Sequence, residues 1–290
     1  MAAVAQTGKV CGRRIEVEAT RDRSLLRAFL EQDRLFAAYA LCDLDEREFG
    51  RTHWGVAYDE GRPVSVVLEY TGLAPQPLFV MGDTQGVVAI LRDVIRPRVG
   101  YLASLPDVLA DVEQLYRVDQ GPPMVRMAVD RTTFRPFPGA TARLLPAEIG
   151  DLNRLYNLGF TAWLPGHTIV QGVYYGIRIG NRLVAAAGTH VISPEARLGC
   201  VGNVMTHTDY RGRGYAKMTT SAVTQDLLRS CDDVVLNVRA DNPRALAAYR
   251  ALGYREHVRF EERLVSRRST RWDSILAPLR RLFPPARSSE

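Results

Sequence analysis

The chain has 290 residues, of which 46% are hydrophobic and 24% charged, and its formal net charge is +6. This length suffices for two domains of ordinary size, and the composition is that of a soluble globular protein, which excludes a largely disordered chain. No apolar stretch approaches the ~20 residues of a transmembrane helix, and the start at Met1–Gln6 is too short for the apolar core of a secretory signal. We therefore expect a cytoplasmic protein.

Cysteine usage and charge exclude two further classes. Cys11, Cys42, Cys200 and Cys231 show no paired zinc spacing, so we expect reduced thiols and no metal, with Cys200 as a small core residue on a strand. The positive charge would attract a polyanion, but no helix-turn-helix, zinc-finger or RNA-stacking motif accompanies it. We therefore expect no nucleic-acid partner.

The first half of the chain predicts a helix, three strands and a second helix. These elements span residues 24–39, 53–58, 63–70, 78–81 and 87–94. A turn at residues 59–62 joins the first two strands, and the sequence Gly-Asp-Thr-Gln-Gly at residues 82–86 precedes the second helix.

Prolines and glycines gather in residues 121–139, which predicts a boundary between two halves. A helix over residues 147–158 and strands over residues 172–179 and 182–192 follow it. The pair Gly180–Asn181 predicts a tight hairpin turn between these strands.

The most informative segment is the run Tyr-Arg-Gly-Arg-Gly-Tyr-Ala at residues 210–216. A β-rich stretch at residues 199–206 precedes it and a helical pattern follows, so the order is strand, glycine-rich turn, helix. Gly212 and Gly214 allow backbone N–H groups to converge on a pyrophosphate at the positive end of the helix. Lys217 stands where a dinucleotide fingerprint requires glycine, and no Gly-Lys-Ser/Thr follows, which excludes two other phosphate motifs.

Downstream, residues 234–238 predict a buried strand and residues 242–254 a short helix with clear ends. Asn242 can cap the first amides, Pro243 suits the first helical position, and Gly253 can adopt the left-handed conformation that stops the helix.

Together the two segments resemble the GNAT superfamily of N-acetyltransferases. Arg211, Gly214 and Ala216 fit the pattern Arg/Gln-x-x-Gly-x-Gly/Ala of its coenzyme A loop. Residues 242–254 fit Asn-x-x-Ala-x-x-x-Tyr-x-x-x-Gly-Phe/Tyr at every fixed position. The resemblance covers about residues 138–265.

The resemblance implies a site for acetyl-CoA as acyl donor, and no metal. The strand before the loop would pair with the pantetheine arm, the loop amides would hold the pyrophosphate, and Asn242 would contact the coenzyme where two strands diverge. The residues so implied are Val204, Met205, Thr206, Arg211, Gly212, Arg213, Gly214, Tyr215, Ala216, Lys217 and Asn242. Tyr249 would be the catalytic acid that protonates the departing thiolate, unless it is a core tyrosine with its hydroxyl tied to a carbonyl. Gly202 would mark a bulge that opens the gap between the strands.

A general base is not evident. Some GNAT members carry a glutamate at the position of Asn237, and an amide accepts no proton at neutral pH. The alternatives are a water chain, a carboxylate from another segment, or His190 or His207, either of which can also be structural.

The first half repeats the same outline without the coenzyme loop, so it resembles a degenerate GNAT-like domain that walls the acceptor cleft, forms a dimer surface or is a structural appendage. The predicted fold class is α/β (α+β), with tandem GNAT-like domains, each a mixed, mostly antiparallel sheet flanked by helices. The predicted ranges are 14–130, 138–265 and a basic tail at 266–290. In the tail, apolar residues fall near one face of a possible helix, a pattern that a membrane-surface or partner-binding helix also has, but packing on the protein's own body or disorder is the more common outcome.

The resemblance implies an acyl-CoA-dependent N-acyltransferase, most simply one that transfers acetyl to a primary amine by direct attack. The acceptor would be a small molecule or peptide, and a homodimer is possible. The alternative is a coenzyme A-binding sensor or scaffold with little turnover, which the amide at Asn237 permits.

Overall fold

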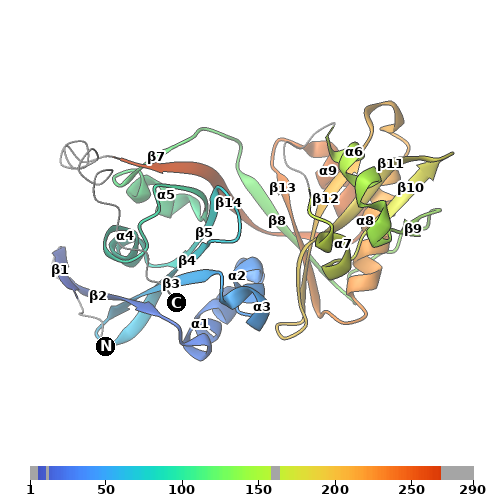
Figure 1. The fold of residues 1–290 in the computed structure, drawn as a ribbon. Coiled ribbons are helices and arrows are strands. Elements are labelled where there is room, and N and C mark those ends of the chain that lie inside the picture. Colours follow the sequence, from blue (N-terminus) through green and yellow to red (C-terminus); the bar gives the residue numbers. More distant parts are fainter. Residues whose placement is uncertain (1–5, 11–12, 158–163, 269–290) are drawn as a thin grey trace, which may run out of the picture.

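The computed structural model describes residues 6–10, 13–157 and 164–268, and it has one sheet in each half of the chain (Figure 1). A long last strand, β14 (Arg255–Arg267), belongs to both sheets. Among the described helices, none is both long enough and apolar enough to cross a membrane.

The sheet of the N-terminal half has the strand order β1-β2-β3-β4-β5-β6-β14, with β7 also paired to β14. The strands are β1 (Gln6–Val10), β2 (Arg13–Thr20), β3 (Thr52–Asp59), β4 (Arg62–Tyr70), β5 (Gln76–Gly82), β6 (Val99–Ser104) and β7 (Tyr116–Val118). All of these pairings are antiparallel except that of β5 with β6.

The sheet of the C-terminal half has the order β14-β8-β13-β12-β11-β10-β9. Its strands besides β14 are β8 (Met124–Asp130), β9 (Ala142–Arg143), β10 (Tyr175–Ile179), β11 (Arg182–Ser193), β12 (Leu198–Thr206) and β13 (Asp233–Arg239). Again one pairing is parallel, that of β12 with β13. The two sheets therefore repeat one arrangement, as the sequence predicts.

The halves exchange strands. β8 lies in the predicted range of the first domain, 14–130, but pairs with β13 and with residues 255–260 of β14. In the other direction, residues 261–266 of β14 pair with β6 of the N-terminal sheet. The domain ranges 14–130 and 138–265 stay a prediction. β8 falls in the first range but pairs in the C-terminal sheet, and the end of β14 falls in the second range but pairs in the N-terminal sheet.

The predicted helices lie close to described ones, with one exception, whereas the described helices over residues 46–49, 106–112 and 167–171 were not predicted. They are α1 (Arg23–Leu30), α2 (Ala38–Cys42), α3 (Glu46–Phe49), α4 (Thr84–Asp93), α5 (Pro106–Val112), α6 (Ile149–Tyr156), α7 (His167–Gln171), α8 (Tyr215–Leu227) and α9 (Pro243–Ala251), with 3-10 turns η1 (Glu31–Asp33), η2 (Pro146–Glu148) and η3 (Thr208–Tyr210). The single helix predicted over residues 24–39 is interrupted. Its Asp33 carboxylate accepts from the backbone N–H of Phe36 at 3.1 Å, which competes with a continuing helix.

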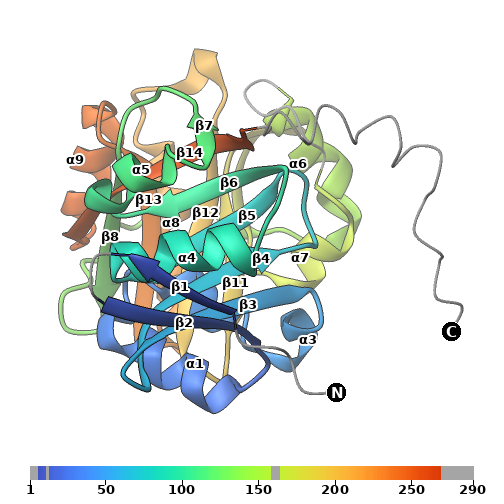
Figure 2. The ribbon, with the colours of Figure 1, turned by 90° about the vertical axis from the view of Figure 1, so that its left-hand side faces the viewer.

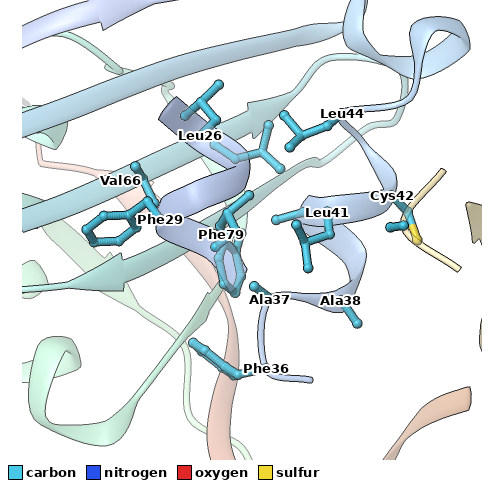
Figure 3. Packing of buried hydrophobic residues seen from close by; sticks show 14 of the residues in the cluster. Leu26, Phe29, Phe36, Ala37, Ala38, Leu41, Cys42, Leu44, Val66 and Phe79 are labelled. Carbon is cyan, nitrogen blue, oxygen red and sulfur yellow. The ribbon is translucent and has the colours of Figure 1, made fainter. Parts of the chain in front are cut away.

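The largest core cluster lies between the two halves. Side chains of α1, of α2 and of the segment between them, including Leu26, Leu41 and Phe36, pack on the N-terminal sheet at Val66 and Phe79 (Figure 3). The same cluster reaches the C-terminal sheet, where its members are Leu198, Cys200, Val235 and Phe260. Each such side chain contributes roughly 1.5–3 kcal/mol when fully buried, so the halves form one body.

Polar contacts surround this shared core. Arg23 and Arg27 both bind Glu195 at 2.8 and 2.6 Å, and His257 contacts Asp33 at 2.6 Å. These ion pairs connect residues 23–33 to the C-terminal half of the chain.

The outer face of each sheet carries its own helices. In Figure 2, α4 lies across the N-terminal sheet, where it contacts β2, β3, β4 and β5. On the C-terminal sheet, α8 packs on β10, β11 and β12. The predicted tail helix falls mostly on residues 269–290, outside the described residues.

Candidate functional site

The parallel strands β12 and β13 open at their carboxyl ends. Their pairing runs from Leu198 opposite Asp233 to Val201 opposite Leu236 and then stops. Beyond that point β12 pairs only with β11 and β13 only with β8. Past this point, main-chain groups on the facing edges of β12 and β13 are not paired with each other and can be reached by a ligand between the strands.

A bulge on β12 lies at the opening. Gly202 pairs with Gly188 and Met205 with Ala186, so the two residues between them, Asn203 and Val204, face a single residue of β11. Asn203 has φ +53, which turns the local backbone out of the ladder. The sequence predicted a bulge at Gly202. The glycine has a further role, because a Cβ there would lie 2.2 Å from Nε2 of His190.

The glycine-rich loop connects β12 to α8 as predicted. Gly212 and Gly214 have φ of +80 and +79, a region that residues with a Cβ rarely adopt. Gly214 is the N-cap of α8 and supplies no side-chain cap. From Gly212 to Lys217, no backbone N–H donates to another residue in the described part of the chain. Six donors at the positive end of a helix are therefore available to an anion.

Positive side chains surround these amides. Arg213 lies 5.2 Å from the centre of the Tyr210 ring, and the ammonium of Lys217 lies 3.7 Å from the centre of the Phe137 ring. Neither they nor Arg211 forms an ion pair with a described carboxylate. Their charge is left to act on a ligand.

The corresponding junction in the N-terminal half is closed. There α4 follows β5, and its N-cap Asp83 accepts from the N–H of Gly86 at 3.2 Å. A carboxylate therefore occupies the end of the helix that an anion would need. The absence of a coenzyme loop in the first half stays a prediction.

Tyr249 lies on α9 over the opening, on the face of the sheet that carries α8. It packs with Val201, Leu236 and Val238, and the partly buried Val204 joins the same cluster. The side chain is 8% exposed, and its hydroxyl makes no hydrogen bond to any described residue. The alternative of a hydroxyl tied to a carbonyl thus has no support in this part of the chain. Burial raises the pKa of Tyr249 to about 12.

Two further predicted residues have local roles as well. The Asn242 side chain caps α9 by accepting from the N–H of Ala245 at 3.1 Å, as the sequence suggested. The Thr206 hydroxyl is sealed from solvent and has no hydrogen-bond partner among the described residues.

Asn237 is held in a buried polar group. Its amide oxygen accepts from Nε of Arg126 at 2.6 Å, and its amide nitrogen donates to Glu262 at 3.2 Å. Arg126 is 2% exposed and also donates to the backbone oxygens of Leu35 and Phe36. Burial raises the pKa of Glu262, while the positive charge of Arg126 opposes that rise. This carboxylate comes from β14, and sequence reasoning missed it because no local pattern marks it.

The two candidate histidines lie in different places. His207 is buried beside Arg182, with 2.5 Å between Nε2 and Nη2, and it lines a hollow bounded by α6 and the start of β11. His190 lies beside the β12 bulge, with its Nε2 3.2 Å from Oδ1 of Asn203. Only His190 is therefore at the strand opening.

No set of three or more His, Cys, Asp or Glu side chains gathers as for a metal within residues 6–10, 13–157 and 164–268. The described cysteines Cys42, Cys200 and Cys231 are buried thiols. Cys200 belongs to the shared core, as predicted.

Comparisons with known proteins agree with this geometry. Residues 174–264 match the family model of the FR47-like protein, a GNAT-related family. No curated protein matches the chain. The matched residues include the opening, the loop and α9.

Among solved structures, a GCN5-related N-acetyltransferase from Sphaerobacter thermophilus superposes with a TM-score of 0.60 at 14% identity, over 87% of this chain and 95% of that one. The tandem GNAT protein from the clavulanic acid biosynthesis pathway has a TM-score of 0.55 at 12% identity, over 88% and 99%. A GCN5-related N-acetyltransferase from Kribbella flavida has 0.53 at 18%, over 72% and 89%. At these identities the likeness is one of fold. The predicted tandem fold and the resemblance to GNAT proteins are confirmed.

Proposed function

We propose that this chain, which has the tandem GNAT fold, transfers an acyl group, most simply acetyl, from coenzyme A to a primary amine. The amine attacks the thioester directly. The C-terminal half holds the donor, and the N-terminal half borders the acceptor side of the opening. The acceptor is a small molecule or a peptide.

The observation that carries this proposal is the junction of β12 and α8. Six backbone N–H groups without partners among the described residues, two glycines with positive φ and three cationic side chains without carboxylate partners meet there. This arrangement suits a diphosphate. The strand opening beside it gives an extended acyl arm a main chain to pair with.

Tyr249 supplies the acid of the reaction. Because burial raises its pKa to about 12, the phenol keeps its proton at neutral pH and can donate a hydrogen bond to the developing thiolate. As the amine nitrogen bonds to the acyl carbon, the carbon–sulfur bond breaks and the thiolate takes the phenol proton.

The test is an acyl-transfer assay on the full chain. Acetyl-CoA is supplied with pools of amino acids, polyamines, amine-bearing antibiotics and peptides with free N-termini, and released thiol is measured. We expect amine-dependent thiol release. Acetyl-CoA that binds without turnover in any pool would indicate a sensor instead.

Tyr249→Phe separates the two functions further. We expect acyl transfer to fall about 100-fold while calorimetry shows unchanged affinity for coenzyme A, because the phenol acts on the leaving group. Tyr175→Phe is the matched control, since its hydroxyl bonds Asp226 at 3.2 Å on the outer part of the sheet. Equal rates for Tyr249→Phe and the control would remove Tyr249 from the chemistry.

A further inference from the structure

His190 joins the two halves of the molecule beside the opening. Its Nδ1 lies 2.9 Å from the hydroxyl of Tyr39 on α2, and its Nε2 lies 3.2 Å from Oδ1 of Asn203 on the β12 bulge. Although 151 positions separate the first pair in sequence, the rings lie 6.0 Å apart. The site at the opening therefore includes a side chain of the N-terminal half.

The direction of the hydrogen bonds determines which ring nitrogen of His190 carries the proton. The backbone oxygen of Thr189 can only accept, so the Tyr174 hydroxyl donates to it, at 2.9 Å. Asn203 must then donate to Tyr174 through its amide nitrogen, at 3.0 Å, which turns its oxygen toward His190. The Nε2 of neutral His190 is consequently the protonated nitrogen, and Nδ1 accepts from Tyr39.

The bulge that carries Asn203 is itself well supported. Tyr156 donates to the backbone oxygen of Asn203 at 2.5 Å, from a position on α6. Three side chains thus hold Asn203 in its positive-φ conformation, two through its amide group and one through its carbonyl. The orientation of the His190 ring is set in advance.

Charged and titratable groups from four elements act on Tyr39. The guanidinium carbon of Arg126, from β8, lies 4.9 Å from the centre of the Tyr39 ring. Glu262 of β14, Cys200 of β12 and Cys42 of α2 also act on Tyr39 electrostatically. Burial raises the pKa of Tyr39 well above its ordinary value.

The His190 ring reaches solvent, yet neighbouring protein atoms displace much of its water and lower its pKa. At neutral pH the pair is therefore a phenol that donates to a neutral imidazole. This is the protonation state in which a base is ready to act.

We propose that Tyr39 and His190 form the proton relay that deprotonates the acceptor amine, so that the N-terminal half supplies a catalytic residue to the site. This inference rests on the proposed acyl transfer. The incoming ammonium gives one proton to Oη of Tyr39 while the Tyr39 proton passes to Nδ1 of His190. The products are a neutral amine, an intact phenol and an imidazolium, which releases its proton to solvent.

The remaining protons balance with Tyr249. After the carbon–nitrogen bond forms, the nitrogen loses its second proton, which replaces the one that Tyr249 gave to the thiolate. One proton per turnover thus leaves through His190 and one ends on coenzyme A. No other reactant is required.

The test compares Tyr39→Phe with wild type over pH, using amines of high and low pKa and acetyl-CoA as donor. With an alkylamine near pH 7 we expect kcat/KM to fall about 100-fold, and the fall to shrink as pH approaches the amine's own pKa. A weakly basic amine, already neutral, should lose much less. A merely structural role would lower every rate alike at all pH values.

His190→Gln should show the same dependence on pH and amine, because glutamine hydrogen-bonds but accepts no proton. Tyr70→Phe is the control, since its hydroxyl bonds Glu48 in the same half and away from His190. Glu262→Gln tests the competing carboxylate. If Glu262→Gln removes the pH dependence of kcat/KM and Tyr39→Phe does not, the proposed relay is wrong.

A readout without turnover completes the design. Nitrogen-15 spectra of histidine-labelled protein should show one imidazole protonated on Nε2, assigned by its loss in His190→Gln, with an Nδ1 resonance that shifts in Tyr39→Phe. An Nδ1-protonated His190 would overturn the inference. Absence of thiol release by wild type would instead remove the proposed function, so the two failures are distinguishable.

Discussion

Asp43 shows at the scale of one residue how burial and neighbouring charges perturb a side chain. It follows the last residue of α2, the helix that packs on β11 and β12. Burial, with the negative charges of Glu48 and Asp45 nearby, raises the pKa of Asp43 to about 8. Folding therefore keeps this carboxyl protonated where the unfolded chain would release the proton.

The sign of the effect on stability follows directly. An unfolded aspartate has a pKa of about 3.9, so the unfolded chain binds fewer protons between about pH 4 and pH 8. The contribution of Asp43 to stability is full below that window and is lost as pH rises through it.

We therefore predict that Asp43→Asn raises the thermal midpoint relative to wild type at pH 8 by a few degrees and that the difference vanishes by pH 4. Asparagine mimics the neutral carboxyl at every pH. Thermal unfolding followed by circular dichroism measures this. Asp119→Asn, an exposed change of the same charge, is the control, and a pH-independent difference for Asp43→Asn would contradict the assignment.

At the scale of elements, α4 and α8 occupy equivalent places, because each connects the two strands that pair in parallel in its sheet, yet their first turns differ. Asp83 caps α4 with its own carboxylate, whereas Gly214 leaves the first amides of α8 without a side-chain partner. The same helix dipole is satisfied internally in one half and is available to a ligand in the other.

We predict that Gly214→Trp abolishes detectable binding of coenzyme A without unfolding the chain. A Cβ at Gly214 would meet Phe137 and Met218 only at 3.9 and 4.0 Å, so the indole projects from the loop and covers the amides. Calorimetric titration with coenzyme A provides the measurement.

Gly180→Trp is the matched control, because Gly180 has φ +56 in the β10–β11 hairpin and no atom near its Cβ position. It carries similar backbone strain away from the loop. Normal affinity in Gly214→Trp, or equal loss in both variants, would contradict the proposed anion site.

At the scale of the whole molecule, the exchange of β8 and β14 ties the halves together through main-chain hydrogen bonds. β8 has both of its neighbours, β13 and β14, in the C-terminal sheet. Arg126, on this strand, donates to backbone oxygens of Leu35 and Phe36 in the other half. The halves therefore depend on each other for edge strands and for core.

We predict that a chain cut after Phe137 folds only when both fragments are present. The N-terminal fragment would hold β8 without its partners, and the C-terminal fragment would lack the strand between β13 and β14. Co-expressed fragments should co-elute in size exclusion and unfold in one transition. A single fragment that is monomeric and unfolds cooperatively would show that the exchanged strands are dispensable.

The sequence by itself determined the features that depend on a few neighbouring residues. The Asn242 cap, the left-handed Gly253 and Gly180, and the glycine-rich turn before α8 follow from local sterics and hydrogen bonding, which any chain with these residues obeys. The hydrophobic pattern likewise located β3, β4, β5, β10, β11, β12 and β13 to within a few residues.

Only the tertiary structure decided which strands cross between the sheets and which polar side chains meet at the opening. Tyr39, His190 and Asn203 come from three elements, and Asn237 meets Arg126 and Glu262 from two more. Such contacts form because burial of the shared core brings distant segments together. The pattern of neighbouring residues in the sequence does not show which distant segments will meet. The glycine-rich loop before α8 was therefore readable in the sequence, whereas the polar contacts between distant elements at the strand opening were not.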